Sequence, residues 1–84
     1  MRTTQYIEYR VKLSTEKDSG MTIAEVPTLG IADQGKTPLE ALTNIRKMVE
    51  FHLDCLLEEG SSIPTEKRGA EGFYLKVRHP VRAA

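Results

Sequence analysis

The stretch that decides the fold lies in the middle of the chain and runs Gly30-Ile31-Ala32-Asp33-Gln34-Gly35-Lys36-Thr37-Pro38-Leu39-Glu40. Its first eight residues fit the phosphate-loop pattern of nucleotide-binding proteins, in which two glycines are followed by Lys and Thr. The end of the stretch also fits a helix start. Thr37 can accept a hydrogen bond from the Glu40 amide, and Glu40 can reach back to the Thr37 amide. Pro38 suits the first helical position, where no amide partner is missed.

The helix start is the better interpretation, because a phosphate loop needs a larger setting. Nucleotide hydrolysis requires a buried parallel sheet, crossover helices on both faces and a second acidic residue that holds magnesium. Only residues 1–29 precede Gly30, and no long apolar strand ending in Asp follows Gly60. The 84 residues predict one small domain spanning residues 1–84. We therefore expect no nucleotide or other cofactor.

Working outward from this start, the apolar pattern predicts a helix over residues 38–59, ended by Gly60 in the left-handed cap conformation. At about 100° per residue, one broad face collects the apolar side chains of Ala41, Leu42, Ile45, Met48, Val49, Leu53 and Leu56. Period-two alternation and turn residues predict strands over residues 7–13, 21–26, 29–33 and 73–77. The order β-β-β-α-β predicts an α+β domain with one long helix packed on an antiparallel sheet.

Composition limits the core and the location of the protein. Hydrophobic residues make up 39% of the chain, with three Tyr, two Phe and no Trp, so the core is modest. We expect further burial in a homodimer or a higher homo-oligomer, with Phe51 as a contact because it widens the apolar arc of the helix. The single cysteine excludes an intrachain disulfide. Neither a membrane-spanning run nor an apolar signal core is present, which favours a cytoplasmic protein.

Few residues are candidates for chemistry. His52 falls near the middle of the apolar face, where a core histidine is the favoured interpretation. Cys55 follows three residues later, but two such residues on one helix cannot complete a zinc site. Cys55 is also flanked by acidic residues, whereas a nucleophilic thiol needs an electropositive setting. We expect no catalytic residue and no metal site, so the chain is predicted not to be an enzyme.

Charge is balanced overall but unevenly distributed along the chain. The net charge is zero, yet residues 37–63 are predominantly acidic and residues 64–84 predominantly basic. Glu50, Asp54 and Glu58 recur every four residues and form an acidic stripe on the helix, which is either a solvated face or a surface for a basic protein. The rival docking surface is the second face of the sheet, whose candidate residues are Tyr6, Arg10, Tyr74 and Lys76.

Several short motifs lie along the chain at a defined spacing: Val26-Pro27-Thr28-Leu29-Gly30, the run from Gln34 to Leu42, Asn44-Ile45 and Ile63-Pro64. Together these motifs and their spacing resemble the HicB-like antitoxin family. The resemblance implies a partial ribonuclease-H-like fold with the same order of strands and helix. It also implies a type II antitoxin of a toxin–antitoxin system, which binds and neutralises a small basic HicA-type mRNA interferase by occlusion. The alternative is a stand-alone oligomeric structural or regulatory module of the same fold, without a toxin partner.

The chain departs from the family pattern in three places. The family often has Leu-Pro-Gly where Leu29-Gly30 stands here, and often an acidic residue at the position of Lys36. Many members append a DNA-binding segment after the last strand, whereas only residues 80–84 follow here. We therefore expect no separate DNA-binding domain and do not carry over DNA binding. No recognition helix or aromatic ladder accompanies the basic residues either.

Overall fold

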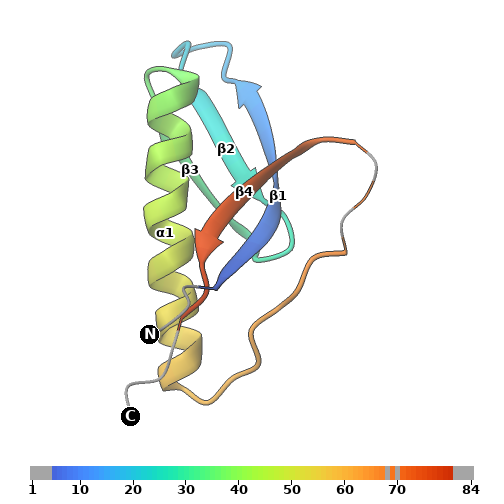
Figure 1. Ribbon diagram of the computed structural model, residues 1–84. Coiled ribbons are helices and arrows are strands. Elements are labelled where there is room, and N and C mark those ends of the chain that lie inside the picture. The colour runs from blue at the N-terminus through green and yellow to red at the C-terminus, as the bar shows by residue number, and fades with distance from the viewer. Residues whose placement is uncertain (1–4, 68, 70, 81–84) are drawn as a thin grey trace.

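A four-stranded antiparallel sheet with one helix packed on one of its faces forms the domain (Figure 1). The computed structural model describes residues 5–67, 69 and 71–80. In chain order the elements are β1 (Tyr6–Thr15), β2 (Thr22–Val26), β3 (Ile31–Gly35), α1 (Pro38–Glu58) and β4 (Phe73–Arg78). The strands lie in the order β3-β2-β1-β4. The predicted α+β class and the order β-β-β-α-β are confirmed.

Strand β1 connects the two parts of the sheet, because its two halves pair with different neighbours. Its carboxyl-terminal half pairs with β2, from Lys12 opposite Glu25 to Thr15 opposite Thr22. Its amino-terminal half pairs with β4, over residues 6–11 of β1 and 73–78 of β4. The final strand is therefore attached to the first strand of the chain, on the side away from β2 and β3.

Strand β3 begins two residues later than residues 29–33 predict. Leu29 and Gly30 instead belong to a turn, in which both of their amides donate to the Val26 carbonyl, at 3.1 and 3.0 Å. Gly30 has a φ of 67°, a conformation that glycine adopts without steric cost. The strand consequently starts at Ile31 and extends to Gly35, a residue that the sequence pattern placed in the loop before the helix.

Gly35 is buried because the backbone of the helix lies directly on it. A methyl group at this position would lie 2.4 Å from the backbone nitrogen of Ala41 and 2.7 Å from the carbonyl carbon of Glu40. Glycine is therefore required at this position, because any side chain would overlap the backbone of α1. Gly35 pairs with Thr22, and all of residues 31–35 pair with β2. The second glycine of the apparent phosphate pattern therefore allows a strand and a helix to touch, and residues 31–35 do not form a loop.

Both ends of α1 are capped by local hydrogen bonds. The Thr37 hydroxyl accepts from the Glu40 amide at 3.1 Å, as predicted, and Pro38 is the first helical residue. The Glu40 carboxylate, however, accepts from the Lys36 amide at 3.3 Å and not from that of Thr37. Thr37 has an extended backbone (φ −130°, ψ 161°), and the carboxylate binds the amide of the residue before it instead. At the other end Glu59 is the cap, so the helix is one residue shorter than expected.

The carboxyl-terminal cap uses Gly60 in the predicted left-handed conformation, with a φ of 74°. The Gly60 amide donates to the Leu57 carbonyl at 3.1 Å, and the Ser61 amide donates to the Leu56 carbonyl at 2.9 Å. These two bonds form a Schellman motif, which satisfies carbonyls that the end of a helix otherwise leaves without partners.

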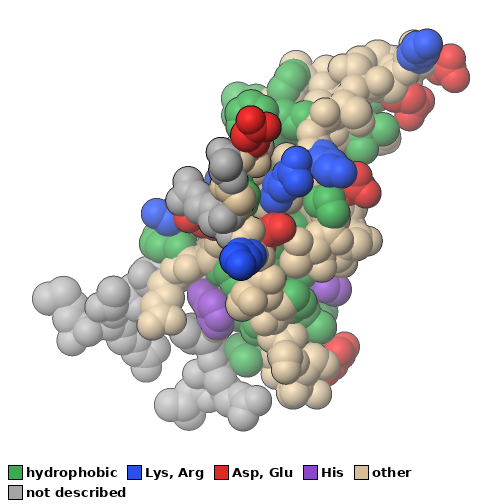
Figure 2. Space-filling model, turned by 90° about the vertical axis from the view of Figure 1, so that its right-hand side faces the viewer, with side chains coloured by type: hydrophobic (Ala, Val, Ile, Leu, Met, Phe, Trp, Pro, Cys, Tyr) green, Lys and Arg blue, Asp and Glu red, His purple; other side chains and the backbone are tan. Residues whose placement is uncertain are grey.

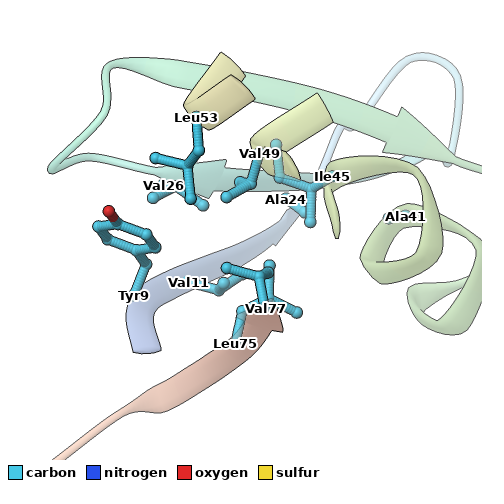
Figure 3. Close-up of a cluster of buried hydrophobic side chains, with 10 residues drawn as sticks. All are labelled: Tyr9, Val11, Ala24, Val26, Ala41, Ile45, Val49, Leu53, Leu75 and Val77. Carbon is cyan, nitrogen blue, oxygen red and sulfur yellow. The ribbon is translucent and has the colours of Figure 1, made fainter. Parts of the chain in front are cut away.

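The hydrophobic core lies between α1 and one face of the sheet (Figure 3). Four buried side chains of α1 recur every fourth residue and face six from β1, β2 and β4. The cluster consists of Tyr9, Val11, Ala24, Val26, Ala41, Ile45, Val49, Leu53, Leu75 and Val77. Leu42, Met48 and Leu56, which the helical pattern placed on the same face, are half-buried at its margins.

Tyr9 is the largest fully buried side chain, and it ties the segment after α1 to the sheet. Its hydroxyl donates to the Pro64 carbonyl at 2.5 Å. Burial, together with the nearby Glu66 carboxylate, raises the pKa of Tyr9 above its ordinary value of 10.0. Both effects disfavour the phenolate.

We predict that Gly35→Ala lowers the free energy of unfolding by about 3 kcal/mol, because the added methyl group overlaps backbone atoms that cannot rotate away. Urea denaturation measures the loss. The matched control is Gly69→Ala, whose methyl group would meet the Tyr74 hydroxyl at an ordinary 3.5 Å. The control should change stability by no more than about 0.5 kcal/mol. Equal stabilities of the two variants would contradict the close approach of α1 to β3.

Thr37→Ala is expected to destabilise the protein by about 1 kcal/mol, because the Glu40 amide loses its acceptor. Thr37→Ser keeps the hydroxyl and should retain most of the stability. Thermal unfolding of the three proteins tests the cap, and equal losses in both variants would show that the hydroxyl plays no part.

Tyr9→Phe should cost about 1 kcal/mol at neutral pH through the lost bond to Pro64. The folded-state pKa of Tyr9 is raised, so the contribution of the hydroxyl is complete below about pH 10 and is lost as the pH rises through the folded-state pKa. The stability difference between wild type and Tyr9→Phe should therefore shrink above about pH 10. Urea denaturation from neutral to alkaline pH measures it, and a constant difference would refute the raised pKa.

Candidate docking surfaces

The second face of the sheet carries the side chains that alternate with the core residues. On β1 these include Tyr6, Arg10 and Lys12, and on β4 they include Lys76 and Arg78. Helix α1 packs on the opposite face, where the core lies (Figures 1 and 3). We call this second face the open sheet face. Basic and acidic side chains are interspersed on the side of the molecule that Figure 2 shows.

Two of the predicted docking residues, Tyr6 and Lys76, form an exposed pair on the open sheet face. The Lys76 ammonium nitrogen lies 5.1 Å from the centroid of the Tyr6 ring. This is a cation–π geometry, which at exposed sites contributes roughly 0.5–1 kcal/mol. The Tyr6 side chain remains 56% exposed, so the pair presents an aromatic ring and a positive charge together.

The other two predicted sheet residues, Arg10 and Tyr74, are opposite each other in the β1–β4 ladder and lie close to the segment between α1 and β4. The Arg10 amide donates to Glu66 Oε1 at 2.7 Å, and the Gly69 amide donates to the Tyr74 hydroxyl at 2.7 Å. A methyl group on Gly72 would lie 3.1 Å from Arg10 Nε. The structure thus brings all four residues onto one face, but Arg10 and Tyr74 also position this connecting segment.

The acidic stripe lies on α1, on the other layer of the domain. Asp54 and Glu58 are exposed and Glu50 is half-buried. Successive members are four residues apart, or about 6 Å along the helix axis. Phe51, the predicted oligomer contact, lies on the same side of α1 and is 71% exposed. We call Glu50, Phe51, Asp54 and Glu58 together the acidic helix face.

Two further exposed apolar residues were not predicted as site residues. Leu39 at the start of α1 is 74% exposed, and Phe73 at the start of β4 is 68% exposed. With the half-buried Leu42 they line a groove of about 250 Å³ between the helix and the sheet. One feature of the sequence indicates this groove: Leu39 is a large apolar residue outside the predicted buried face of the helix.

The residues considered for chemistry do not converge. His52, expected in the core, is only half-buried, and so is Cys55, which is a free thiol. His79 lies beyond β4, with Nδ1 2.8 Å from the Pro80 carbonyl oxygen. Within residues 5–67, 69 and 71–80, no three His, Cys, Asp or Glu side chains are grouped so as to hold a metal ion. Over the same residues, no helix has the length and apolar character needed to cross a membrane.

Neither models of protein families, nor curated proteins, nor solved structures give a match to this chain.

Proposed function

We propose that this protein is an antitoxin-type binding module, which neutralises a small basic mRNA interferase of the HicA type by covering it. The observation that carries the proposal is the acidic helix face, on which exposed Phe51 lies beside the row of three carboxylates. An exposed aromatic residue surrounded by charge is a common arrangement for an interface anchor and its rim. The β-β-β-α-β order agrees with the fold that the HicB-like resemblance implies.

Inhibition in this proposal is by occlusion. Carboxylates about one helical turn apart can pair with the basic side chains that the toxin uses to hold RNA phosphates. Phe51 would then bury its ring against the toxin, which excludes water from the centre of the contact. This protein contributes no reacting group, so toxin activity is lost because the RNA cannot reach the surface that binds it.

The alternative is a stand-alone oligomeric module without a toxin partner, and exposed Phe51 is also the observation that favours it. In that case Phe51 packs against a second copy of the chain. Sedimentation of Phe51→Ser beside the wild type distinguishes the two. If the wild type is an oligomer and Phe51→Ser dissociates it, the alternative is favoured. If the wild type is a monomer and Phe51→Ser weakens toxin binding, the antitoxin is favoured.

We predict that reversing Glu50, Asp54 and Glu58 to Lys slows association with a co-expressed HicA-type toxin about tenfold or more at low salt. The effect should shrink at high salt, because exposed charges are screened. Stopped-flow mixing measures the rate. The control reverses Glu16 and Asp18, two exposed acidic residues between β1 and β2, away from both candidate docking surfaces.

Equal slowing by the control would show that net charge acts, without a local docking site. An unchanged rate in the helix variant at low salt would exclude the acidic helix face. The open sheet face, with Tyr6 and Lys76, would then be the better candidate for the toxin contact.

A further inference from the structure

The two outer strands of the sheet differ in how their exposed edges are protected. On β3, both outward backbone groups of Gln34 are occupied by side chains. Its amide donates to Asp33 Oδ1 at 2.8 Å, and its carbonyl accepts from Asn44 Nδ2 at 2.8 Å. Such contacts prevent another strand from pairing with an edge. Strand β3 is therefore blocked at Gln34.

Strand β4 has a more accessible edge. The His79 amide donates to the Gln5 carbonyl at 2.8 Å, which extends the β1–β4 ladder by one pair. In an antiparallel ladder the direction of the backbone groups alternates, so those of Lys76 and Arg78 point outward. The Lys76 carbonyl accepts from Arg46 Nη1 at 2.5 Å. Arg46 is an exposed side chain, which an incoming amide can displace.

The groove beside this edge gives an added strand a place for its apolar side chains. Leu39, Leu42 and Phe73 line it, and Leu39 and Phe73 are mostly exposed. Strand β4 lies beside β1 at the edge of the sheet, and the groove is at its start, where Phe73, Tyr74 and Leu75 line it. A strand paired with β4 would direct every second side chain toward this groove.

We propose that the β4 edge and this groove bind an extended segment of another protein as a fifth strand, with alternating apolar and acidic side chains. The apolar side chains enter the groove beside Leu39 and Phe73. The acidic ones lie on the open sheet face beside Lys76 and Arg78, on the side of β4 away from Glu8, which lies opposite Lys76 on β1. Main-chain hydrogen bonds supply affinity and the alternation supplies specificity, as in other cases of strand addition.

A second copy of β4 fits this edge less well. Antiparallel pairing of two β4 strands would bring Lys76 and Arg78 of both chains close together on one face, and like charges on paired strands are destabilising. The site also uses neither Phe51 nor the acidic stripe. Binding at this site can therefore be tested separately from toxin binding at the acidic helix face.

The test is a titration of the isotope-labelled full chain with a short synthetic peptide that alternates Leu and Glu, followed by nuclear magnetic resonance. We expect the largest shifts at the amides of Lys76 and Arg78, with dissociation constants on the order of 100 μM. A peptide alternating Leu and Lys should bind at least about tenfold more weakly. Methylating the peptide nitrogens that face β4 should abolish binding, because the donors are lost.

Variants of the protein test the same contacts. Lys76→Glu with Arg78→Glu should weaken the Leu–Glu peptide about tenfold, whereas the control Lys12→Glu with Lys17→Glu should leave its affinity within about twofold. The proposal is overturned if β4 amides do not move at millimolar Leu–Glu peptide, or if the methylated peptide binds equally well. It is also overturned if the free chain sediments as a dimer that Phe73→Ser dissociates, since a second copy of the chain then occupies the β4 edge.

Discussion

The contact between Gly35 and the first turn of α1 is the constraint on which the rest of the structure depends. Here a strand and a helix meet backbone to backbone, with backbone atoms of Glu40 and Ala41 at the point of closest approach. Across the sheet the helix is separated from β1 and β4 by larger side chains such as Tyr9, Leu75 and Val77. The helix is therefore closest to the sheet at β3. The groove lined by Leu39 and Phe73 lies on the opposite side, next to β4.

The sequence predicted the architecture because burial imposes periods that can be counted. Alternation located β1, β2 and β4, and the cap at Thr37 with the apolar face located α1. The prediction from sequence was wrong where the same residue type can be required for two different physical reasons. Gly35 was read as a loop residue because glycine suits unusual backbone angles, but it is a strand residue that leaves space for the helix. That error ended the predicted β3 two residues too early, and the unrecognised turn at Leu29 and Gly30 started it two residues too early.

The candidate surfaces were less predictable than the fold. Alternation shows which face of a sheet a residue occupies, so Tyr6, Arg10, Tyr74 and Lys76 could be assigned to one face. It does not show which strands are neighbours or where an aperiodic segment runs. The pairing of Lys76 with Tyr6 depends on the β1–β4 register, and the contact of Arg10 with Glu66 depends on the segment after α1. Both require the tertiary structure.

The division of β1 between two partners has a consequence for the order in which the structure can form. Its carboxyl-terminal half pairs with β2, which follows within a few residues. Its amino-terminal half pairs with β4, which comes after α1 in the sequence. Contacts between distant residues carry a larger loop-closure cost and form more slowly. On a ribosome, the hairpin and α1 can therefore assemble while the amino-terminal half of β1 still lacks its neighbour. A nascent chain would expose this half-strand to proteases and chaperones until β4 emerges.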